Sequence, residues 1–358
     1  MTRFILRRLI ASIPVMLGIV MLVFVLARVI PGDPCVATYG EKATEEICNA
    51  FNARYGLNRP IWEQFLIYLG ALLQGDLGSS IRFGRPVADI LIERLPVTIE
   101  LTLFALTFAT VVGVSLGLVS ALRRNSPADV GTMVVANLGV STPVFVLGLV
   151  LQIIFAVWLK DTFLSLPPSG RLTAGTDVVP LAVAWGLQDL QGPLRAALDF
   201  LSNLNVLNAI LSLNGPLFVD AVSHLILPAI AVGTIPLAII ARMTRSSLLE
   251  VLGLDFIRTA RAKGLRERLV ISRHGMRNAM LPVVTVVGLS IAGFLSGAIL
   301  TETIFNLAGI GRTLFEAIQG RDYIVIQGVT LVVALGYVII NLVVDVSYAF
   351  LDPRIRLG

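Results

Sequence analysis

Six long runs of the sequence contain no Asp, Glu, Lys or Arg and consist mostly of apolar residues. They cover 9–27, 101–122, 130–159, 221–241, 279–301 and 323–344. About 20 apolar residues in a helix cross the hydrocarbon core of a bilayer, so each run predicts one transmembrane helix. A shorter apolar patch at 178–187 is too short to cross and predicts an interfacial or re-entrant segment.

Two of the segments between these runs are long enough to form small helical subdomains, namely 31–97 and 160–220. The first repeats apolar residues at helical spacing in two groups, and the second does so over 194–211. The two groups are Ile47, Phe51 and Tyr55, then Phe65, Leu69 and Leu72. The apolar faces of 31–97 are explained either by a cap that packs on the membrane side of the protein or by a docking surface for an external partner.

The first apolar run follows Arg3, Arg7 and Arg8 and could be mistaken for a signal peptide. However, this run is longer than a signal h-region, and it ends in "RVIPGDP" without a small-residue cleavage site. We therefore expect a retained first transmembrane helix.

The composition agrees with an integral membrane protein. Hydrophobic residues make up 56% of the chain and charged residues only 14%, whereas a soluble domain has about 25% charged residues. With so few polar side chains, a soluble catalytic core is not expected.

The distribution of basic residues predicts the orientation. If both ends lie inside the cell, the inside segments 1–8, 123–129, 242–278 and 345–358 carry 16 Lys/Arg and six acids. The outside segments are more than twice as long, yet they carry 11 Lys/Arg and 16 acids. Because basic residues mark the cytoplasmic side, both termini are expected in the cytoplasm. The most basic segment, 242–278, then lies there as well.

Cys35 and Cys48 are the only cysteines, and both fall in the first outside segment. An oxidising compartment favours a disulfide, which for a loop of this size contributes about 3 kcal/mol. Two unpaired small residues are the alternative.

Several kinds of chemistry are missing from the sequence. No G-x-x-x-x-G-K-[ST] motif for ATP occurs, nor any clustered metal ligands or nucleophile–base pair. The interiors of the predicted spans are nearly free of the ionisable residues that an ion-driven transporter needs. Glu302 stands at the edge of a span, where it either lines the mouth of a pathway or pairs with Arg312 or Arg321. A secondary transporter and a membrane enzyme are therefore disfavoured.

Residues 255–265 read "DFIRTARAKGL" and predict a short basic helix. Asp255 can cap its start, and Gly264 suits the left-handed residue just past its end. Phe256, Ile257 and Ala260 share one face, while Arg258 and Arg261 share another. A helix this short is not stable alone, which favours docking to a partner protein. Binding to nucleic acid is disfavoured because this helix lacks interleaved aromatic residues. Contact of the arginines with anionic lipid is a further alternative, which can coexist with docking to a protein.

These residues resemble the permease subunits of ABC importers of the dipeptide, oligopeptide and nickel type. "TARAKGL" with a downstream "RHGMRNAMLP" is similar to the coupling loop of the peptide subfamily. Eleven further motifs resemble that family in the same order: "IPGDP", "YGLNRP", "QFLIYL", "GDLGSS", "RLPVTIELTL", "STPVFVLG", "LPPSGR", "HLILPAI", "LTETIFNLAGIGR", "RDYIVIQG" and "LDPRIR". The large first outside segment resembles the B-type permease. The length of 160–220 and the cysteine pair depart from the commonest form.

The resemblance implies an all-α protein with six transmembrane helices and a three-part organisation. Residues 1–30 would form the N-terminus and first span, 31–97 an extracytoplasmic subdomain, and 98–358 the core permease domain with a coupling loop at 242–280. It implies a non-catalytic subunit of the prokaryotic inner membrane that binds no cofactor. A sister permease, two ATPase subunits that use ATP and Mg, an extracytoplasmic solute-binding protein and membrane lipids would be its partners, without nucleic acid.

The resemblance also assigns residues. The coupling helix, with Phe256 and Ile257 inserted into the ATPase and the basic residues facing its acidic groups, would comprise Asp255, Phe256, Ile257, Arg258, Thr259, Ala260, Arg261, Lys263 and Gly264. Ser141, Pro143 and Glu302 are candidates for the translocation path. Di- or oligopeptides are the expected substrates, and nickel or another small solute is the alternative.

Overall fold

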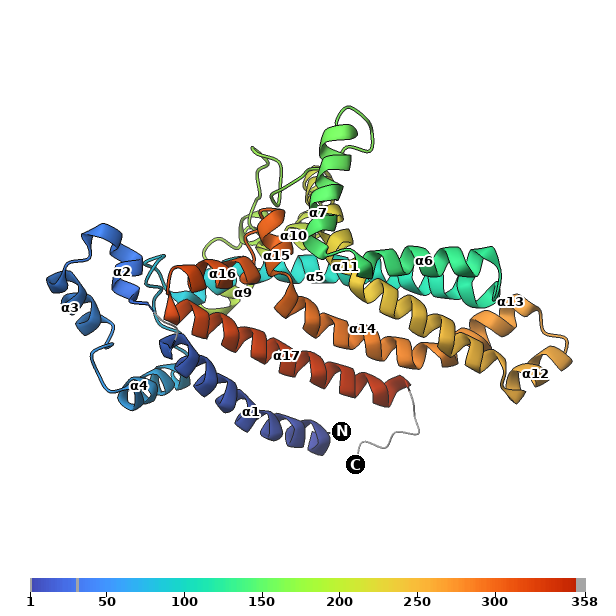
Figure 1. Ribbon diagram of the computed structural model, residues 1–358, viewed down its shortest axis with the longest axis horizontal. Coiled ribbons are helices and arrows are strands. Elements are labelled where there is room, and N and C mark those ends of the chain that lie inside the picture. Colours follow the sequence, from blue (N-terminus) through green and yellow to red (C-terminus); the bar gives the residue numbers. More distant parts are fainter. Residues whose placement is uncertain (1, 30–31, 352–358) are drawn as a thin grey trace. The chain divides into compact units, whose positions relative to one another are not determined.

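A computed structural model describes residues 2–29 and 32–351. Positions 1, 30–31 and 352–358, which include parts of the "IPGDP" and "LDPRIR" motifs and of the predicted C-terminal segment, lie outside the described residues. The regular structure of the described part is helical (Figure 1), and one isolated β-bridge there joins Ser79 to Pro86. The predicted all-helical fold class is confirmed.

The helices follow one another along the chain as the apolar patterns predict. Their bounds are α1 (Thr2–Val29), α2 (Pro34–Tyr39), η1 (Gly40–Lys42), α3 (Glu45–Arg54), α4 (Ile61–Leu73), α5 (Val87–Leu122), α6 (Pro127–Ser141), α7 (Val144–Gln152), η2 (Ile153–Trp158), α8 (Leu181–Ala184), α9 (Pro193–Ser202), α10 (Asn205–Leu211), α11 (Gly215–Leu252), α12 (Asp255–Ala262), α13 (Glu267–Leu269), η3 (Val270–Met276), α14 (Arg277–Gly297), α15 (Ile299–Ile304), α16 (Ile310–Gln319) and α17 (Tyr323–Leu351). The helices expected within 31–97 form as α3 and α4, and the one expected over 194–211 is divided into α9 and α10.

Four of the described helices are long and apolar enough to cross a membrane: α1, α5, α11 and α17. The third predicted span is broken, because α6 and the helix from Val144 to Trp158 meet at an angle of 102°. Counted as one span, the bent pair raises the number to five. The fifth predicted span overlaps α14, which has 21 residues, and the count of six spans stays a prediction. The patch at 178–187 contains the short helix α8.

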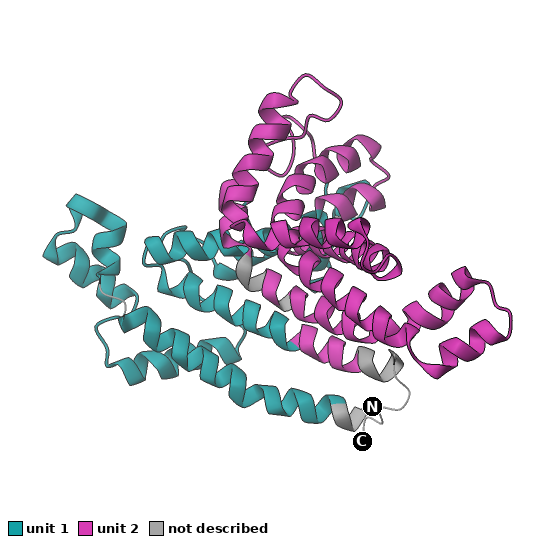
Figure 2. Cartoon of the chain, turned by 45° about the vertical axis from the view of Figure 1, so that its right-hand side comes forward, with its two compact units in different colours: residues 1–98, 179–204, 308–338 teal, residues 99–178, 205–307, 339–358 magenta. Residues whose placement is uncertain are grey.

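Two compact units share the chain, and both are discontinuous in sequence (Figure 2). Unit 1 comprises 1–98, 179–204 and 308–338, and unit 2 comprises 99–178, 205–307 and 339–358. The helices α5 and α17 contribute to both units. The division into 1–30, 31–97 and 98–358 stays a prediction.

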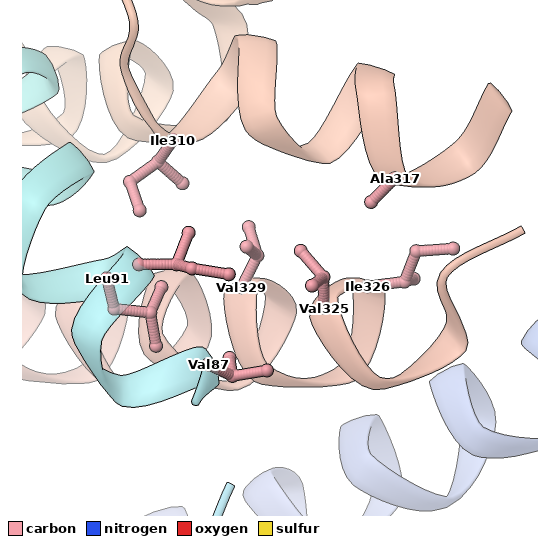
Figure 3. Close-up of a cluster of buried hydrophobic side chains, with 8 residues drawn as sticks. Val87, Leu91, Ile310, Ala317, Val325, Ile326 and Val329 are labelled. Carbon is pink, nitrogen blue, oxygen red and sulfur yellow. The ribbon is translucent and has the colours of Figure 1, made fainter. Parts of the chain in front are cut away.

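The core of unit 1 forms where the N-terminal part of α5 meets α16 and α17. Figure 3 shows its buried aliphatic side chains pointing toward one another from these three helices; they are Val87, Ile90, Leu91, Ile310, Ala317, Val325, Ile326 and Val329. A buried carboxylate lies beside this core, because Asp322 accepts hydrogen bonds from the Ser80 hydroxyl at 2.5 Å and from the Arg82 backbone N–H at 3.0 Å. Satisfying a buried charge in this way fixes the loop before α5 against the start of α17.

The helix α11 organises unit 2. It contacts α6, α7, α10, α14 and α15, and 72% of its most apolar window is buried inside the protein, against 11% for α1. This burial, and not its hydropathy, distinguishes α11 from α17, whose most apolar window is also 11% buried. The elements of unit 2 are therefore positioned by their contacts with α11.

Glycines of α5 allow this helix to approach α11 closely. A Cβ atom at Gly113 would lie 2.8 Å from the Leu237 carbonyl oxygen, and one at Gly117 would lie 2.5 Å from the Ala241 carbonyl oxygen. On the other side, a Cβ atom at Gly233 of α11 would lie 2.9 Å from the Ala105 carbonyl oxygen. Small residues four apart are a common solution for close helix packing in membranes, where van der Waals contact drives association.

We predict that Gly117→Ala lowers the free energy of unfolding by about 1–3 kcal/mol, the usual cost of overpacking, because its methyl group collides with the backbone of α11. The measurement is the thermal unfolding of the purified protein in detergent. Gly131→Ala is the matched control, since no atom lies within 4 Å of a Cβ at that position in α6. Equal stability of the two variants would contradict the close packing of α5 and α11.

Candidate functional site: the helix at residues 255–262

The short helix α12 lies between α11 and α14 in sequence, together with α13 and η3. In the view of Figure 1 these elements close the far end of the α11–α14 pair. Ile257 is fully buried and Ala260 nearly so, and their cluster includes residues from three long helices and η3: Ala121, Leu248, Val251, Val270 and Ala279. The chain itself therefore supplies the support that an isolated eight-residue helix lacks.

The C-terminal end of α12 is held by a Schellman motif. Gly264 has φ +75°, its N–H donates to the Arg261 carbonyl at 2.9 Å, and the Leu265 N–H donates to the Ala260 carbonyl at 3.4 Å. This pair of backbone hydrogen bonds, with a glycine in the left-handed region, is a common way for a helix to end. The predicted role of Gly264 is confirmed.

The predicted role of Asp255 as a cap is wrong. The capping position is Leu254, which has no side-chain cap, and Asp255 is the first helical residue. Its carboxylate is 95% exposed and lies 3.4 Å from the Arg258 guanidinium. A negative charge in the first turn still stabilises the helix through the helix dipole, so the sequence signal was genuine but one position away from the cap.

The two apolar residues at the start of α12 point in different directions. Phe256 is 42% exposed, whereas Ile257 is 0% exposed. Successive helical residues are about 100° apart, so the face shared by Ile257 and Ala260 does not include Phe256. The expectation that Ile257 enters a partner is therefore wrong, because this side chain already fills the core of its own chain. Within the predicted set, Ile257 and Ala260 are buried, and the exposed members are Asp255, Phe256, Arg258, Thr259, Arg261, Lys263 and Gly264.

Arg261 ties α12 to α13. Its guanidinium donates to both carboxylate oxygens of Glu267, at 3.1 Å from Nε and 2.6 Å from Nη2. These hydrogen bonds raise the pKa of Arg261 and lower the pKa of Glu267. A lowered carboxyl pKa stabilises the fold above the ordinary pKa of the group, and this contribution is lost as the pH falls through the lowered value. Both side chains are about half exposed, so the contribution is small.

The cysteines lie far from α12 in the chain, in α2 and α3 of unit 1. Their sulfur atoms are 2.08 Å apart, at disulfide-bonding distance. Cys35 is buried beside Phe51 and Ile81. The predicted pairing is thus compatible with the structure, and it joins the two helices that begin the 31–97 segment.

The three candidates for the translocation path lie at the bend between α6 and α7 and in α15. Ser141 ends α6 and Pro143 precedes α7, so both stand at the 102° bend. Glu302 is fully buried in α15, a helix that contacts α7. Their roles and the pairing of Glu302 with Arg312 or Arg321 stay predictions.

Sequence reasoning did not find the two hollows that follow α11. The first, of about 440 Å³, is lined by residues of α7, α11 and α14 that are mostly apolar, and Ser290 is a polar exception. The other, of about 680 Å³, lies between α6 and α11. Ile239 borders both. The second contains Arg242, whose Nη1 donates to the Asn137 side-chain oxygen at 2.6 Å, and Arg245, which pairs bidentately with Asp129 at 2.8 Å.

Long apolar helices arranged around a buried α11, with a short exposed helix braced between two of them, define an all-helical integral membrane component. Residues 113–357 match the family described as the binding-protein-dependent transport system inner membrane component, and residues 1–102 match its N-terminal domain. The chain belongs to this family, whose members are the non-catalytic permease subunits of ABC importers.

Curated relatives match over nearly the whole chain. The Dipeptide transport system permease protein DppB of Alkalihalophilus pseudofirmus is 44% identical, and the match covers 99% of this chain and 100% of the length of that protein. The Escherichia coli protein of the same name is 45% identical over 99% of each chain. The Di/tripeptide transport system permease protein DppB of Pseudomonas aeruginosa is 43% identical over 99% of each.

We predict that two neighbouring substitutions in α12 differ strongly in their effect on stability. Ile257→Ala removes a fully buried side chain and should destabilise the seat of α12 by about 2–5 kcal/mol, whereas Phe256→Ala should change stability by no more than about 0.5 kcal/mol. Hydrogen exchange of residues 255–270 measures the local opening in each variant. Equal protection of α12 in the two variants would contradict the assignment of its inner face.

Proposed function

We propose that this chain is the membrane permease subunit of an ATP-driven importer of di- or oligopeptides. The observation that carries the proposal is the end-to-end similarity to permeases named for dipeptide and di/tripeptide transport. Similarity over 99% of the chain includes both the loop with α12 and the apolar helices. It thus extends over the parts that would receive the solute and the parts that would receive the driving force.

A permease of this kind works within an assembly. The partners we infer are a sister permease, two ATPase subunits that bind ATP and Mg, and an extracytoplasmic solute-binding protein. The exposed face of α12 is the proposed contact with an ATPase. Phe256 supplies an apolar group there, and Arg258 and Lys263 supply positive charge for acidic groups of the partner.

The bracing of α12 explains how such a contact could transmit force. Ile257 and Ala260 attach the helix to α11 and α14, while the Arg261–Glu267 pair fixes it to α13. A push on Phe256 would therefore move the ends of two long helices together instead of bending a loop. Rigid-body movement of packed helices is a known form of switching transition.

The proposed solute path runs along α11. The apolar hollow bordered by Val144, Ile235 and Leu289 adjoins the bend that carries Ser141 and Pro143. Apolar walls suit peptides of varied side chains because they impose few specific hydrogen bonds. Glu302, buried in α15, which contacts α7, is the proposed polar group of this path.

The orientation that we propose has both termini in the cytoplasm of a prokaryotic cell. The excess of Lys/Arg in 1–8, 123–129, 242–278 and 345–358 supports it. The same orientation puts α12 on the side where ATP is available, and it puts Cys35 and Cys48 in an oxidising compartment.

The test of this function is uptake of a radiolabelled dipeptide by cells that contain or lack the gene for this chain. We expect uptake to require the gene and ATP and to persist when the proton gradient is collapsed. Gene-dependent uptake of nickel without dipeptide uptake would indicate the alternative substrate class. Gene-dependent uptake that stops with the proton gradient alone would indicate a secondary transporter.

We predict that Phe256→Ala abolishes ATP-dependent dipeptide uptake while the chain remains in the membrane at its normal level, because the exposed ring is the apolar part of the ATPase contact. Phe163→Ala is the matched control, since Phe163 is 95% exposed and lies outside the α12 loop. Normal uptake by the Phe256 variant would overturn the role of α12 in coupling.

A further inference from the structure

The helix α4 has two apolar faces. One face packs on the last turns of α1, where the Phe65 ring contacts Phe24 at a centroid distance of 5.1 Å and Tyr68 stacks on Phe24 at 5.8 Å. Beside these rings, the Arg28 Nε donates to the Gln64 side-chain oxygen at 2.8 Å. These contacts fix α4 to the C-terminal end of α1.

The other face of α4 is uncovered. Trp62 is 66% exposed, Leu66 58% and Leu73 81%. With Leu69 they stand at positions i, i+4, i+7 and i+11, which form one continuous stripe along a helix. A stripe of large apolar side chains marks a contact with another apolar phase, since water-facing positions seldom hold such groups together.

The location of the stripe identifies that phase. The helix α1 is a candidate membrane span whose apolar side chains are exposed along its length, Leu22 among them. The helix α4, which carries the stripe, is attached to α1 near the C-terminal end of this exposed apolar surface. At 1.5 Å per residue, the 13 residues of α4 reach about 20 Å, which is less than the 30 Å needed to cross the bilayer.

The ends of α4 fit an interfacial position. Glu63 in its first turn pairs with Arg59 at 2.8 Å, and polar Gln74 follows its last turn. Trp62, a residue enriched at the boundary between membrane and water, stands next to this ion pair. An apolar stripe flanked by such groups is typical of a helix that lies in the plane of the interface.

We propose that α4 is an interfacial anchor whose Trp62–Leu66–Leu69–Leu73 stripe is inserted into the bilayer leaflet at the C-terminal end of α1. The lipid of that leaflet is its partner. The anchor fixes the middle of the 31–97 segment to the membrane surface, so that α2 and α3, joined by the cysteines, are held at a set height above the bilayer. This role is independent of which solute is transported.

The experiment places a nitroxide spin label at Leu66→Cys or Leu73→Cys in the complete transporter, purified with its partner subunits and reconstituted in lipid bilayers. Accessibility to molecular oxygen, which partitions into lipid, is compared with accessibility to a water-soluble nickel chelate. Both side chains are exposed, so the labels should not disturb the fold. The unsubstituted complex gives the background from other cysteines.

Three reference positions calibrate the result. Leu22→Cys on α1 reports lipid, exposed Asp189→Cys reports water, and Leu181→Cys in α8, whose side chain is fully buried, reports burial in protein. We expect the stripe to resemble Leu22, with oxygen accessibility several-fold above that of Asp189 and low nickel accessibility. Readings like Asp189 would show a water-facing stripe and overturn the proposal. Readings like Leu181, low for both reagents, would show that a protein partner covers α4 and would overturn it equally.

Discussion

The close approach of α5 and α11 is the contact on which unit 2 depends. In a bilayer, helices gain little from burying apolar side chains against one another, so they associate through van der Waals contact and need small residues at the crossing. Gly113 and Gly117 remove the side chains that would keep the two backbones apart. Because α11 in turn contacts α6, α7, α10, α14 and α15, the position of each of these helices follows from this crossing.

The same helix connects the two regions that a transporter must coordinate. The hollows that border Ile239 follow its middle and its C-terminal half, and Leu248 and Val251 near its end form part of the seat of α12. A displacement of α12 would therefore be delivered to the element that lines the hollows. The Arg245–Asp129 pair lines the second hollow and joins α11 to the start of α6, which makes it part of any movement that α11 undergoes.

Sequence reasoning located features that depend on local chemistry. Long charge-free runs gave the helices, and Gly264 gave the end of α12 because only a residue that tolerates positive φ suits that position. It failed where tertiary contacts decide. Ile257 and Phe256 are equally apolar in the sequence, yet only packing against Leu248 and Val270 determines which of them is buried. The 102° bend lies within one apolar run, where Pro143 is the one residue that indicates it. The two hollows are lined by side chains of two and three separate helices, which no local pattern brings together.

A common arrangement relates the two short helices that remain exposed. Both α4 and α12 use one face to pack on their own chain and leave large apolar groups on the other, Trp62 and Leu73 in one case and Phe256 in the other. An outward apolar side chain is useful for force or attachment only if its helix is fixed, because a mobile helix would yield instead of transmitting load. The aromatic contacts of α4 with Phe24 and the burial of Ile257 supply that fixation. The difference lies in the neighbouring charges. Basic Arg258 and Lys263 beside Phe256 suit an acidic protein cleft, whereas the uncharged stripe of α4, a helix that packs on α1, suits lipid.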